Sequence, residues 1–134
     1  MRVIIAGGRD YKFTVKDRKW LDSIHRNWNI EEVISGMARG ADLEGKEWAD
    51  NRGIHVGPFP AKWDDLDAPN AVIRRRKDGK LYNANAGFDR NLKMAKYAKE
   101  NTPSALIAFP GGNGTADMIK TANRMGIPVL ISPY

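Results

Sequence analysis

Short apolar runs separated by longer segments with a helical period are the feature that most limits how this chain can fold. The runs are Val3–Ala6, 33–34, 55–56, Ala105–Ala108 and 129–131. Each is short and apolar enough to be a buried strand. Strands that alternate with helices form a parallel sheet covered on both faces, because each connection must cross back over the sheet. The sequence therefore predicts an α/β protein with a Rossmann-like three-layer fold and a mainly parallel sheet of about five strands.

The segments between these runs carry apolar residues every three or four positions, which is the spacing of one face of a helix. The predicted faces are Leu21, Ile24 and Trp28; Ala41, Gly45, Trp48 and Ala49; Leu92, Ala95 and Ala98; and Thr115, Ile119, Ala122 and Met125. Gly53 and Gly126 follow two of these segments, as residues in the left-handed conformation commonly do where a helix ends. We expect Trp20, Trp28 and Trp48 to pack in the core.

Length and composition limit the class of protein. A chain of 134 residues has the usual size of one domain, so residues 1–134 are predicted to form a single domain. It contains no cysteine, which excludes disulfides and thiolate metal sites. No apolar run approaches the roughly 20 residues that span a membrane, and the N-terminus lacks the pattern of a secretory signal. We therefore expect a cytoplasmic protein that makes no membrane contact.

Histidine placement gives no sign of a metal site. His25 and His55 lie far apart in the chain, and neither has a metal ligand at the usual spacing. We expect no resident cofactor or metal, and a magnesium ion only where a phosphate ligand brings one.

The stretch 65–85 interrupts the regular alternation. Its apolar periodicity fades, and Arg74–Lys77 with Lys80 place five cations in one short segment. Asp78-Gly79 is typical of a two-residue turn, which would join residues 72–77 to 80–82. The sequence thus predicts a small inserted basic hairpin or a mobile flap. With a formal net charge of +6, the chain favours polyanionic partners, either nucleic acid or a nucleotide phosphate, although a solvated hairpin face accounts for the cations equally well.

The carboxyl ends of the parallel strands are where a ligand is expected, since helix N-termini there offer unpaired N–H groups and a partial positive charge. The first strand is followed by Gly7, Gly8, Arg9 and Asp10. Glycine there allows a tight turn and Arg9 can clamp a phosphate, whereas a purely structural turn is the alternative. The second strand is followed by Ser35, Gly36, Arg39, Gly40 and Asp42. Asp42 either caps the next helix or holds ribose hydroxyls.

A third junction gives the strongest signal for a ligand site. Between a predicted strand and a predicted helix it contains Pro110, Gly111, Gly112, Asn113, Gly114 and Thr115. Such a turn brings main-chain N–H groups into a concave nest, and Thr115 can cap the helix or donate its hydroxyl to a phosphate. The turn lacks the Lys-Ser/Thr ending of a Walker loop. We predict an anion site here rather than a merely structural loop.

Three further residues are candidates for ligand contacts. Arg90 and Asn91 lie in the first turns of a predicted helix, where the helix dipole disfavours positive charge. A functional use would explain Arg90, and a solvated surface arginine is the alternative. Trp63 follows a strand among polar neighbours and either stacks on a base or closes the edge of the core.

These residues together resemble the SLOG superfamily, and within it the small YspA-like (YAcAr) group. The shared features are Gly-Gly-Arg-Asp after the first strand, Ala38–Asp42, Trp48-Ala49, Phe59–Trp63, Arg90-Asn91 with Met94, Ala108–Met118 and Gly126–Val129. The resemblance covers nearly the whole chain, and only the stretch 65–85 is longer than expected for the group. It implies a Rossmann-like domain that senses or processes nucleotide-derived ligands, including ADP-ribose-like molecules. It also implies a homodimer formed through helices beside the glycine loop.

A related branch, the lysine-decarboxylase-like (LOG) phosphoribohydrolases, cleaves the N-glycosidic bond of nucleoside monophosphates. The chain is similar to these enzymes at Arg90, Met94 and the glycine loop. They carry a catalytic glutamate three residues after the loop threonine, where this chain has Met118, which transfers no proton. Asp117 stands one position earlier and points about 100° away on a helix. In a hydrolase of this kind Arg90 would grip the phosphate, and Asp42 or Asp117 would stabilise positive charge on the ribose.

Three functions remain at this point. The leading one is the binding of a nucleotide or nucleotide-derived ligand by a sensor, carrier or sequestering protein, which predicts binding without turnover. The first alternative is an N-glycosidic hydrolase or transferase, which predicts slow release of the base. The second alternative is a nucleic-acid-binding module built on the basic stretch 74–80, which predicts binding that depends steeply on salt.

Overall fold

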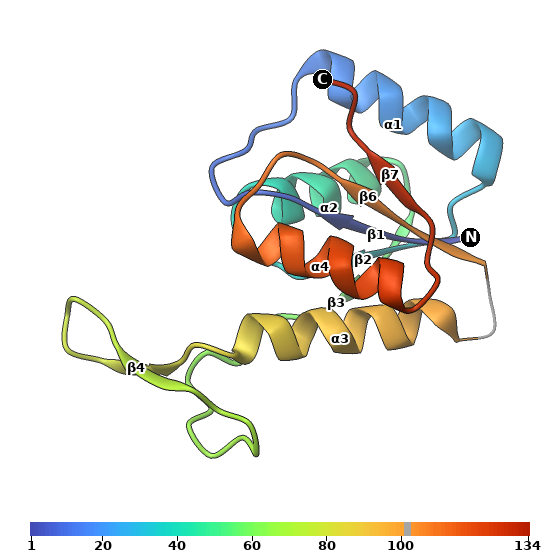
Figure 1. Ribbon diagram of the computed structural model, residues 1–134. Coiled ribbons are helices and arrows are strands. Elements are labelled where there is room, and N and C mark those ends of the chain that lie inside the picture. Colours follow the sequence, from blue (N-terminus) through green and yellow to red (C-terminus); the bar gives the residue numbers. More distant parts are fainter. Residues whose placement is uncertain (101–102) are drawn as a thin grey trace.

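A sheet of five parallel strands forms the centre of the protein (Figure 1). The computed structural model describes residues 1–100 and 103–134. Its strands are β1 (Arg2–Ala6), β2 (Glu32–Ser35), β3 (His55–Pro58), β4 (Ile73–Arg75), β5 (Leu81–Asn83), β6 (Ser104–Ala108) and β7 (Val129–Ile131), and its helices are α1 (Val15–Trp28), α2 (Ala41–Asn51), α3 (Ala86–Lys99) and α4 (Asn113–Arg124). The strand order in the sheet is β3-β2-β1-β6-β7. This confirms the predicted α/β class and all five predicted strands.

Helices cover both faces of the sheet because neighbouring residues of a strand point to opposite faces. Ile5 of β1 packs in the same buried cluster as Leu21 of α1 and Trp48 of α2. Ile4 packs in a second cluster with Met118 of α4 and with Met94, Ala95 and Ala98 of α3. Figure 1 shows the resulting three layers, with α1 and α2 on one side of the sheet and α3 and α4 on the other. Strands buried on both faces must be apolar throughout, which explains their continuous apolar runs.

The ends of two helices confirm the role predicted for their glycines. Gly53 has a φ angle of 67° and Gly126 one of 75°, both in the left-handed region. Trp48 is buried, and Trp20 and Trp28 are partly buried against the same cluster, as predicted. Among residues 1–100 and 103–134, no helix combines the length and the apolar character that a membrane span requires.

The predicted apolar face of α3 is wrong at one residue. Leu92 is 37% exposed, whereas Asn91, Met94, Ala95 and Ala98 are buried. The buried residues repeat at the spacing of a single helical face, and Leu92 lies one residue, or about 100°, around the helix from that face. The apolar pattern did not reveal the buried face of α3, because the polar Asn91 takes a buried position that apolar residues usually occupy.

The predicted basic hairpin is present and projects beyond the start of α3 (Figure 1). We call residues 72–83, which contain β4 and β5, the arm. Its turn differs from the prediction, because the N–H of Arg76 donates to the carbonyl of Lys80 (2.8 Å) and the N–H of Gly79 donates to the carbonyl of Arg76 (3.0 Å). The loop therefore has three residues instead of two. Gly79, with φ at 88°, takes the left-handed position that a three-residue loop requires.

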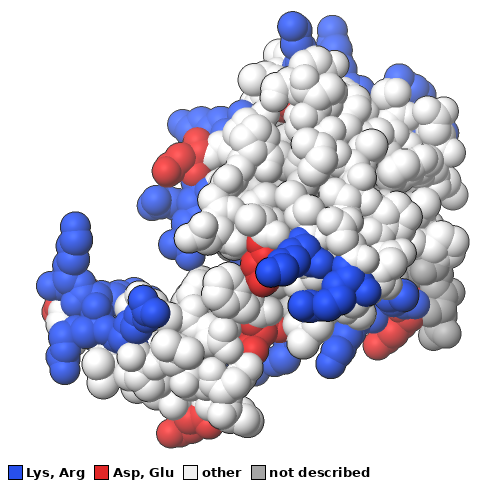
Figure 2. Space-filling view, in the orientation of Figure 1, with Lys and Arg blue, Asp and Glu red and all other residues white. Residues whose placement is uncertain are grey.

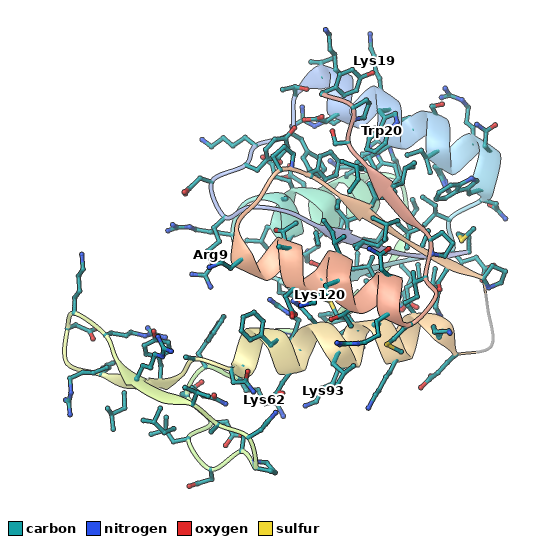
Figure 3. All side chains as sticks on the ribbon, viewed as in Figure 1. Arg9, Lys19, Trp20, Lys62, Lys93 and Lys120 are labelled. Carbon is teal, nitrogen blue, oxygen red and sulfur yellow. The ribbon has the colours of Figure 1, made fainter. Side chains whose placement is uncertain are left out.

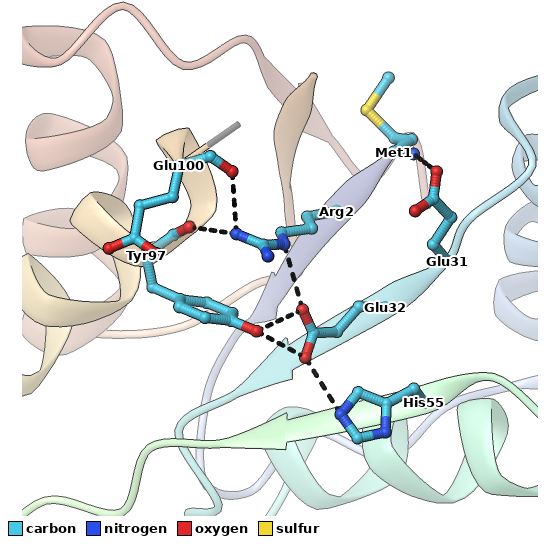
Figure 4. Close-up of polar contacts among 7 residues, drawn as sticks. All are labelled: Met1, Arg2, Glu31, Glu32, His55, Tyr97 and Glu100. Atoms are coloured by element: carbon cyan, nitrogen blue, oxygen red, sulfur yellow. Dashed lines mark hydrogen bonds and ion pairs between the residues drawn. The ribbon is translucent and has the colours of Figure 1, made fainter. Parts of the chain in front are cut away.

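The amino-terminal ends of the strands hold a closed polar cluster around the buried Glu32 (Figure 4). The hydroxyl of Tyr97 donates to both carboxylate oxygens (2.8 and 3.0 Å). Arg2 Nε lies 3.2 Å from one oxygen and His55 Nε2 lies 3.3 Å from the other. Arg2 also donates to the main-chain carbonyls of Tyr97 (2.8 Å) and Glu100 (3.0 Å). The hydrogen bond to Glu32 raises the pKa of Tyr97, and the cluster satisfies the carboxylate within the protein.

Candidate functional site

A cavity of about 390 Å³ lies at the opposite end of the sheet, beside the carboxyl ends of β1 and β6. The strand order reverses between these two strands, which is where open parallel sheets bind ligands. The cavity is lined by Ala6, Gly7, Gly8, Arg9, Ala38, Asp42, Trp63, Ala84, Gly87, Phe88, Arg90, Asn91, Met94, Gly112, Asn113, Gly114, Thr115 and Met118. All three sequence junctions thus contribute to one space.

Gly8, in the first junction, is hydrogen-bonded to the other two junctions. Its carbonyl accepts the N–H of Ala41 at the start of α2 (3.0 Å), and its own N–H donates to the carbonyl of Pro110 (2.8 Å). Gly40 has φ at 82°, and a Cβ on that residue would collide with the carbonyl oxygen of Gly8. Glycine is therefore required at position 40 both by its backbone conformation and by the close approach of the first loop.

The glycine loop ends at the N-terminus of α4. Gly112 is the N-cap, so Thr115 is the third residue of the helix and does not cap it, contrary to one of the two roles predicted for it. The hydroxyl of Thr115 lies against Gly111 instead. The first N–H groups of a helix have no partner within it. Those of residues 113–115 belong to residues that line the cavity.

Arg90 reaches the cavity from the second turn of α3. Its Nη1 donates to the carbonyl of Gly36 (2.6 Å) and its Nε donates to the side chain of Asn91 (3.1 Å). A Cβ on Gly36 would collide with Arg90 and would lie 2.7 Å from the carboxylate of Asp42. Gly36 is therefore the position that lets the guanidinium and the carboxylate approach each other. Burial lowers the pKa of Arg90, and the charge of Asp42 opposes that change.

Asp42 is the buried carboxylate of the cavity. The N-cap of α2 is Gly40, which makes Asp42 the second residue of the helix and rules out the capping role predicted as one alternative. Its carboxylate accepts the N–H of Ala38 (3.3 Å). Burial raises its pKa from 3.8 to about 6, and the positive charge of Arg90 limits the increase.

Asp117 lies behind Asn91 rather than in the cavity. The side-chain amide of Asn91 donates to the carboxylate of Asp117 (3.0 Å) and to the carbonyl of Gly114 (3.1 Å). The position that corresponds to the hydrolase glutamate, Met118, does line the cavity. Arg90 and Asp42 therefore line the same cavity, whereas Asp117 is not among its lining residues.

Trp63 and Arg9 stand at the edge of the cavity. The guanidinium carbon of Arg9 lies 5.5 Å from the centre of the Trp63 ring. The far edge of that ring packs so closely on Gly87 that a Cβ there would lie 3.0 Å from it. Figure 3 shows Arg9 on the loop after β1, on the side towards which the arm projects. Arg9 is exposed, so its guanidinium is free to turn towards a bound anion.

Besides Asp117, seven of the predicted residues do not line the cavity: Asp10, Ser35, Gly36, Arg39, Gly40, Pro110 and Gly111. Several of these residues contact the residues that line the cavity. The hydroxyl of Ser35 donates to the main-chain carbonyl of Asp42 (3.1 Å). Arg39 and Asp10 form an ion pair at the surface (3.4 Å).

Sequence reasoning missed Ala6, Ala38, Ala84, Gly87, Phe88, Met94 and Met118 as lining residues. A signal for part of this set was present. Gly87, Arg90, Asn91 and Met94 repeat with the helical period, so the face of α3 that carries Arg90 also carries Gly87 and Met94. Within residues 1–100 and 103–134 no group of three or more His, Asp or Glu side chains is placed to hold a metal ion.

The sequence model of one protein family, described as the YspA, cpYpsA-related SLOG family, matches residues 1–65. The matched part contains the first two junctions and Trp63. Arg90 and the loop 110–115 lie beyond the matched residues, so their likeness to the superfamily rests on their own motifs. A search of curated proteins found no match to the chain.

The match of residues 1–65 to this family suggests a function related to nucleotides. Two of the three loops that line the cavity, those after β1 and β2, lie within residues 1–65.

Proposed function

We propose that the cavity binds a nucleotide or a nucleotide-derived ligand, such as an ADP-ribose-like molecule, as a sensor, carrier or sequestering protein would. The observation that carries the proposal is that a helix N-terminus, two arginines and an apolar wall converge on one cavity of about 390 Å³. That volume lies in the range of small-molecule sites. The combination suits a ligand with an anionic end and a flat apolar end.

The phosphate end of such a ligand would lie at the N-terminus of α4. Main-chain N–H groups there point outwards, and the helix dipole favours negative charge. Arg9 and Arg90 line the same cavity and would add charge-assisted hydrogen bonds to the phosphate oxygens. A magnesium ion would arrive with the phosphate, since this ion keeps several of its waters and is commonly bound through substrate phosphates.

The base and ribose would lie along the apolar wall. Trp63, Phe88, Met94 and Met118 provide that wall, and an aromatic ring at its edge suits stacking on a base. Asp42, with a pKa of about 6, is ionised at neutral pH and would accept hydrogen bonds from ribose hydroxyls.

Calorimetric titration with AMP, ADP, ADP-ribose and NAD tests the proposal, with chromatography of each mixture afterwards. We expect at least one of these probes to bind and to be recovered intact. Arg9→Gln should weaken its binding roughly tenfold, the loss of one charge-assisted hydrogen bond. Arg39→Gln is the matched control, because it removes the same charge from a residue just outside the cavity, and it should change the affinity less than about twofold. Failure of all four probes to bind would contradict the proposal.

N-glycosidic cleavage is a second candidate, and the position of Asp42 favours it. Its raised pKa of about 6 suits proton transfer near neutral pH. Water would add to the ribose carbon as the bond to the base breaks, with Asp42 accepting the proton of the water and passing one to the departing base. Recovery of free base from AMP or NAD would support this reaction. Asp42→Asn should then abolish base release, and Asp117→Asn should leave it.

A further inference from the structure

The arm contributes little to the packing of the protein. Every residue from Val72 to Leu81 is exposed. Among the residues that the structure describes, the arm is hydrogen-bonded to the rest of the protein at its base, where the N–H of Ala84 donates to the carbonyl of Val72 (2.7 Å) and the N–H of Asn83 donates to the carbonyl of Trp63 (2.6 Å). The side chain of the buried Asn83 also accepts the N–H of Val72 (3.1 Å). Packing against the core therefore does not explain which amino acids occupy the exposed residues 72–81.

That exposed part carries a concentrated positive charge. It contains five cationic side chains, Arg74–Lys77 and Lys80, and a single carboxylate, Asp78. Asp78 accepts the N–H of Lys80 within the turn (3.0 Å). No ion pair between residues that the structure describes involves any of the five cations. Figure 2 shows these side chains gathered on the arm, which stands apart from the rest of the surface. The repulsion between them is relieved most strongly by an external polyanion.

The register of the hairpin places cations on both of its faces. Arg74 pairs with Tyr82 and Arg75 pairs with Leu81, and neighbouring pairs point to opposite faces. The guanidinium carbon of Arg76 lies 5.3 Å from the centre of the Tyr82 ring, so Arg74, Arg76 and an aromatic ring share one face. The opposite face carries Arg75 and Leu81, which is 45% exposed.

We propose that the arm is a two-stranded ribbon that enters a groove of double-stranded nucleic acid. A ribbon with cations on both faces fits a partner that surrounds it, and phosphates line both walls of a groove. The major groove of DNA admits a two-stranded β-ribbon. A membrane or another flat anionic surface would meet only one face and would leave the cations of the other unpaired. Tyr82 and Leu81 lie between the cations and would contact sugars or base edges.

Binding of a fluorescent duplex DNA oligonucleotide, measured by anisotropy across a salt series, tests this proposal. The test variant is Arg74→Gln/Arg76→Gln/Lys77→Gln, which removes three charges from exposed positions and should leave the fold intact. We expect at least a tenfold loss of affinity at low salt, and a slope of log K against log salt that is smaller by about 2 to 3.

The control is Lys19→Gln/Lys93→Gln/Lys120→Gln, which has the same net charge. These lysines lie on α1, α3 and α4, away from the arm (Figure 3). The control should lose less than about threefold in affinity, as general charge effects are weaker than direct phosphate contacts.

Four results would overturn the proposal: no binding to the duplex, equal losses in the two variants, tighter binding to the single strand than to the duplex, or binding to phosphatidylserine vesicles and not to DNA. The arm is separate from the cavity, so the outcome does not depend on the proposed nucleotide site. Nucleotide titration of the arm variant shows this directly, since the variant should bind the nucleotide as the unmodified protein does.

Discussion

The two ends of the sheet each hold a buried carboxylate, in different surroundings. At the amino-terminal end both oxygens of Glu32 accept hydrogen bonds from Tyr97, and Arg2 and His55 lie within 3.3 Å. At the carboxyl-terminal end the carboxylate of Asp42 borders a cavity, and the N–H of Ala38 is the one hydrogen-bond donor it has among the described residues. Burial raises the pKa of Asp42 to about 6. Burial alone therefore does not single out a candidate site, whereas an incompletely compensated charge beside a cavity does.

A pair of glycine variants should give the largest effect and separates the two ends of the sheet. Gly40 and Gly53 both have positive φ, but only Gly40 has another chain segment where a Cβ would lie. Gly40→Ala should lower the free energy of unfolding by about 4 kcal/mol, from strain and from displacement of the first loop. Gly53→Ala should cost about 1 kcal/mol, from strain alone. Urea unfolding measures both, and equal losses would show that the three loops are not locked together.

Glu32→Ala should be nearly as damaging to stability. It leaves the hydroxyl of Tyr97 and the guanidinium of Arg2 without their buried partner, at a cost of about 3 kcal/mol. Nucleotide affinity of the folded variant should not change, since the cluster lies at the other end of the sheet. A variant that remained fully stable but lost nucleotide binding would reverse the roles assigned to the two ends.

Asp42→Asn should stabilise the protein, in contrast to the two preceding variants. The pKa of Asp42 rises from 3.8 to about 6 on folding, so the folded protein holds this proton more tightly than the unfolded chain does. Ionisation then opposes folding, and the unmodified protein should lose about 2 kcal/mol of stability as the pH rises from about 4 to about 6. Asp42→Asn removes this loss and should be the more stable protein above pH 6. Parallel curves of stability against pH for the two proteins would contradict the environment assigned to Asp42.

His55→Gln should have the smallest effect. Its imidazole is 73% exposed, although it lies 3.3 Å from Glu32, and exposed pairs contribute little. We expect a change of less than about 0.5 kcal/mol in the free energy of unfolding. A larger loss would mean that the cluster at the amino-terminal end depends on its exposed member.

The strands of the sheet could be predicted from the sequence, because a strand that is buried on both faces has a short continuous run of apolar residues. The sequence also predicted the three junctions, since glycine-rich turns after strands follow from the close approach of loops such as that of Gly8 to Gly40. The length of the arm's turn was harder to predict, because Asp78-Gly79 occurs in two-residue and three-residue loops alike and the difference depends on the pairing of Arg76 with Lys80.

Side-chain direction accounts for most of what the sequence could not predict in the site. Asp42 and Asp117 look alike as carboxylates within the first two turns of a helix, yet Asp42 borders the cavity and Asp117 accepts a hydrogen bond from Asn91. The distinction depends on how α3 and α4 pack, which no local pattern encodes. Arg90 was identified from its unfavourable place in a helix, but its contact with the carbonyl of Gly36 joins residues far apart in the chain.

The most direct test of the central claim is an amide NMR titration of the protein with AMP and with ADP-ribose. The account predicts chemical-shift changes that cluster at Gly8, Gly112 and Gly114, with the amides of Glu32 and Tyr97 unchanged. Saturating changes confined to the carboxyl-terminal end would establish that end as the nucleotide site. An absence of changes, or changes centred on Glu32 and Tyr97, would contradict it.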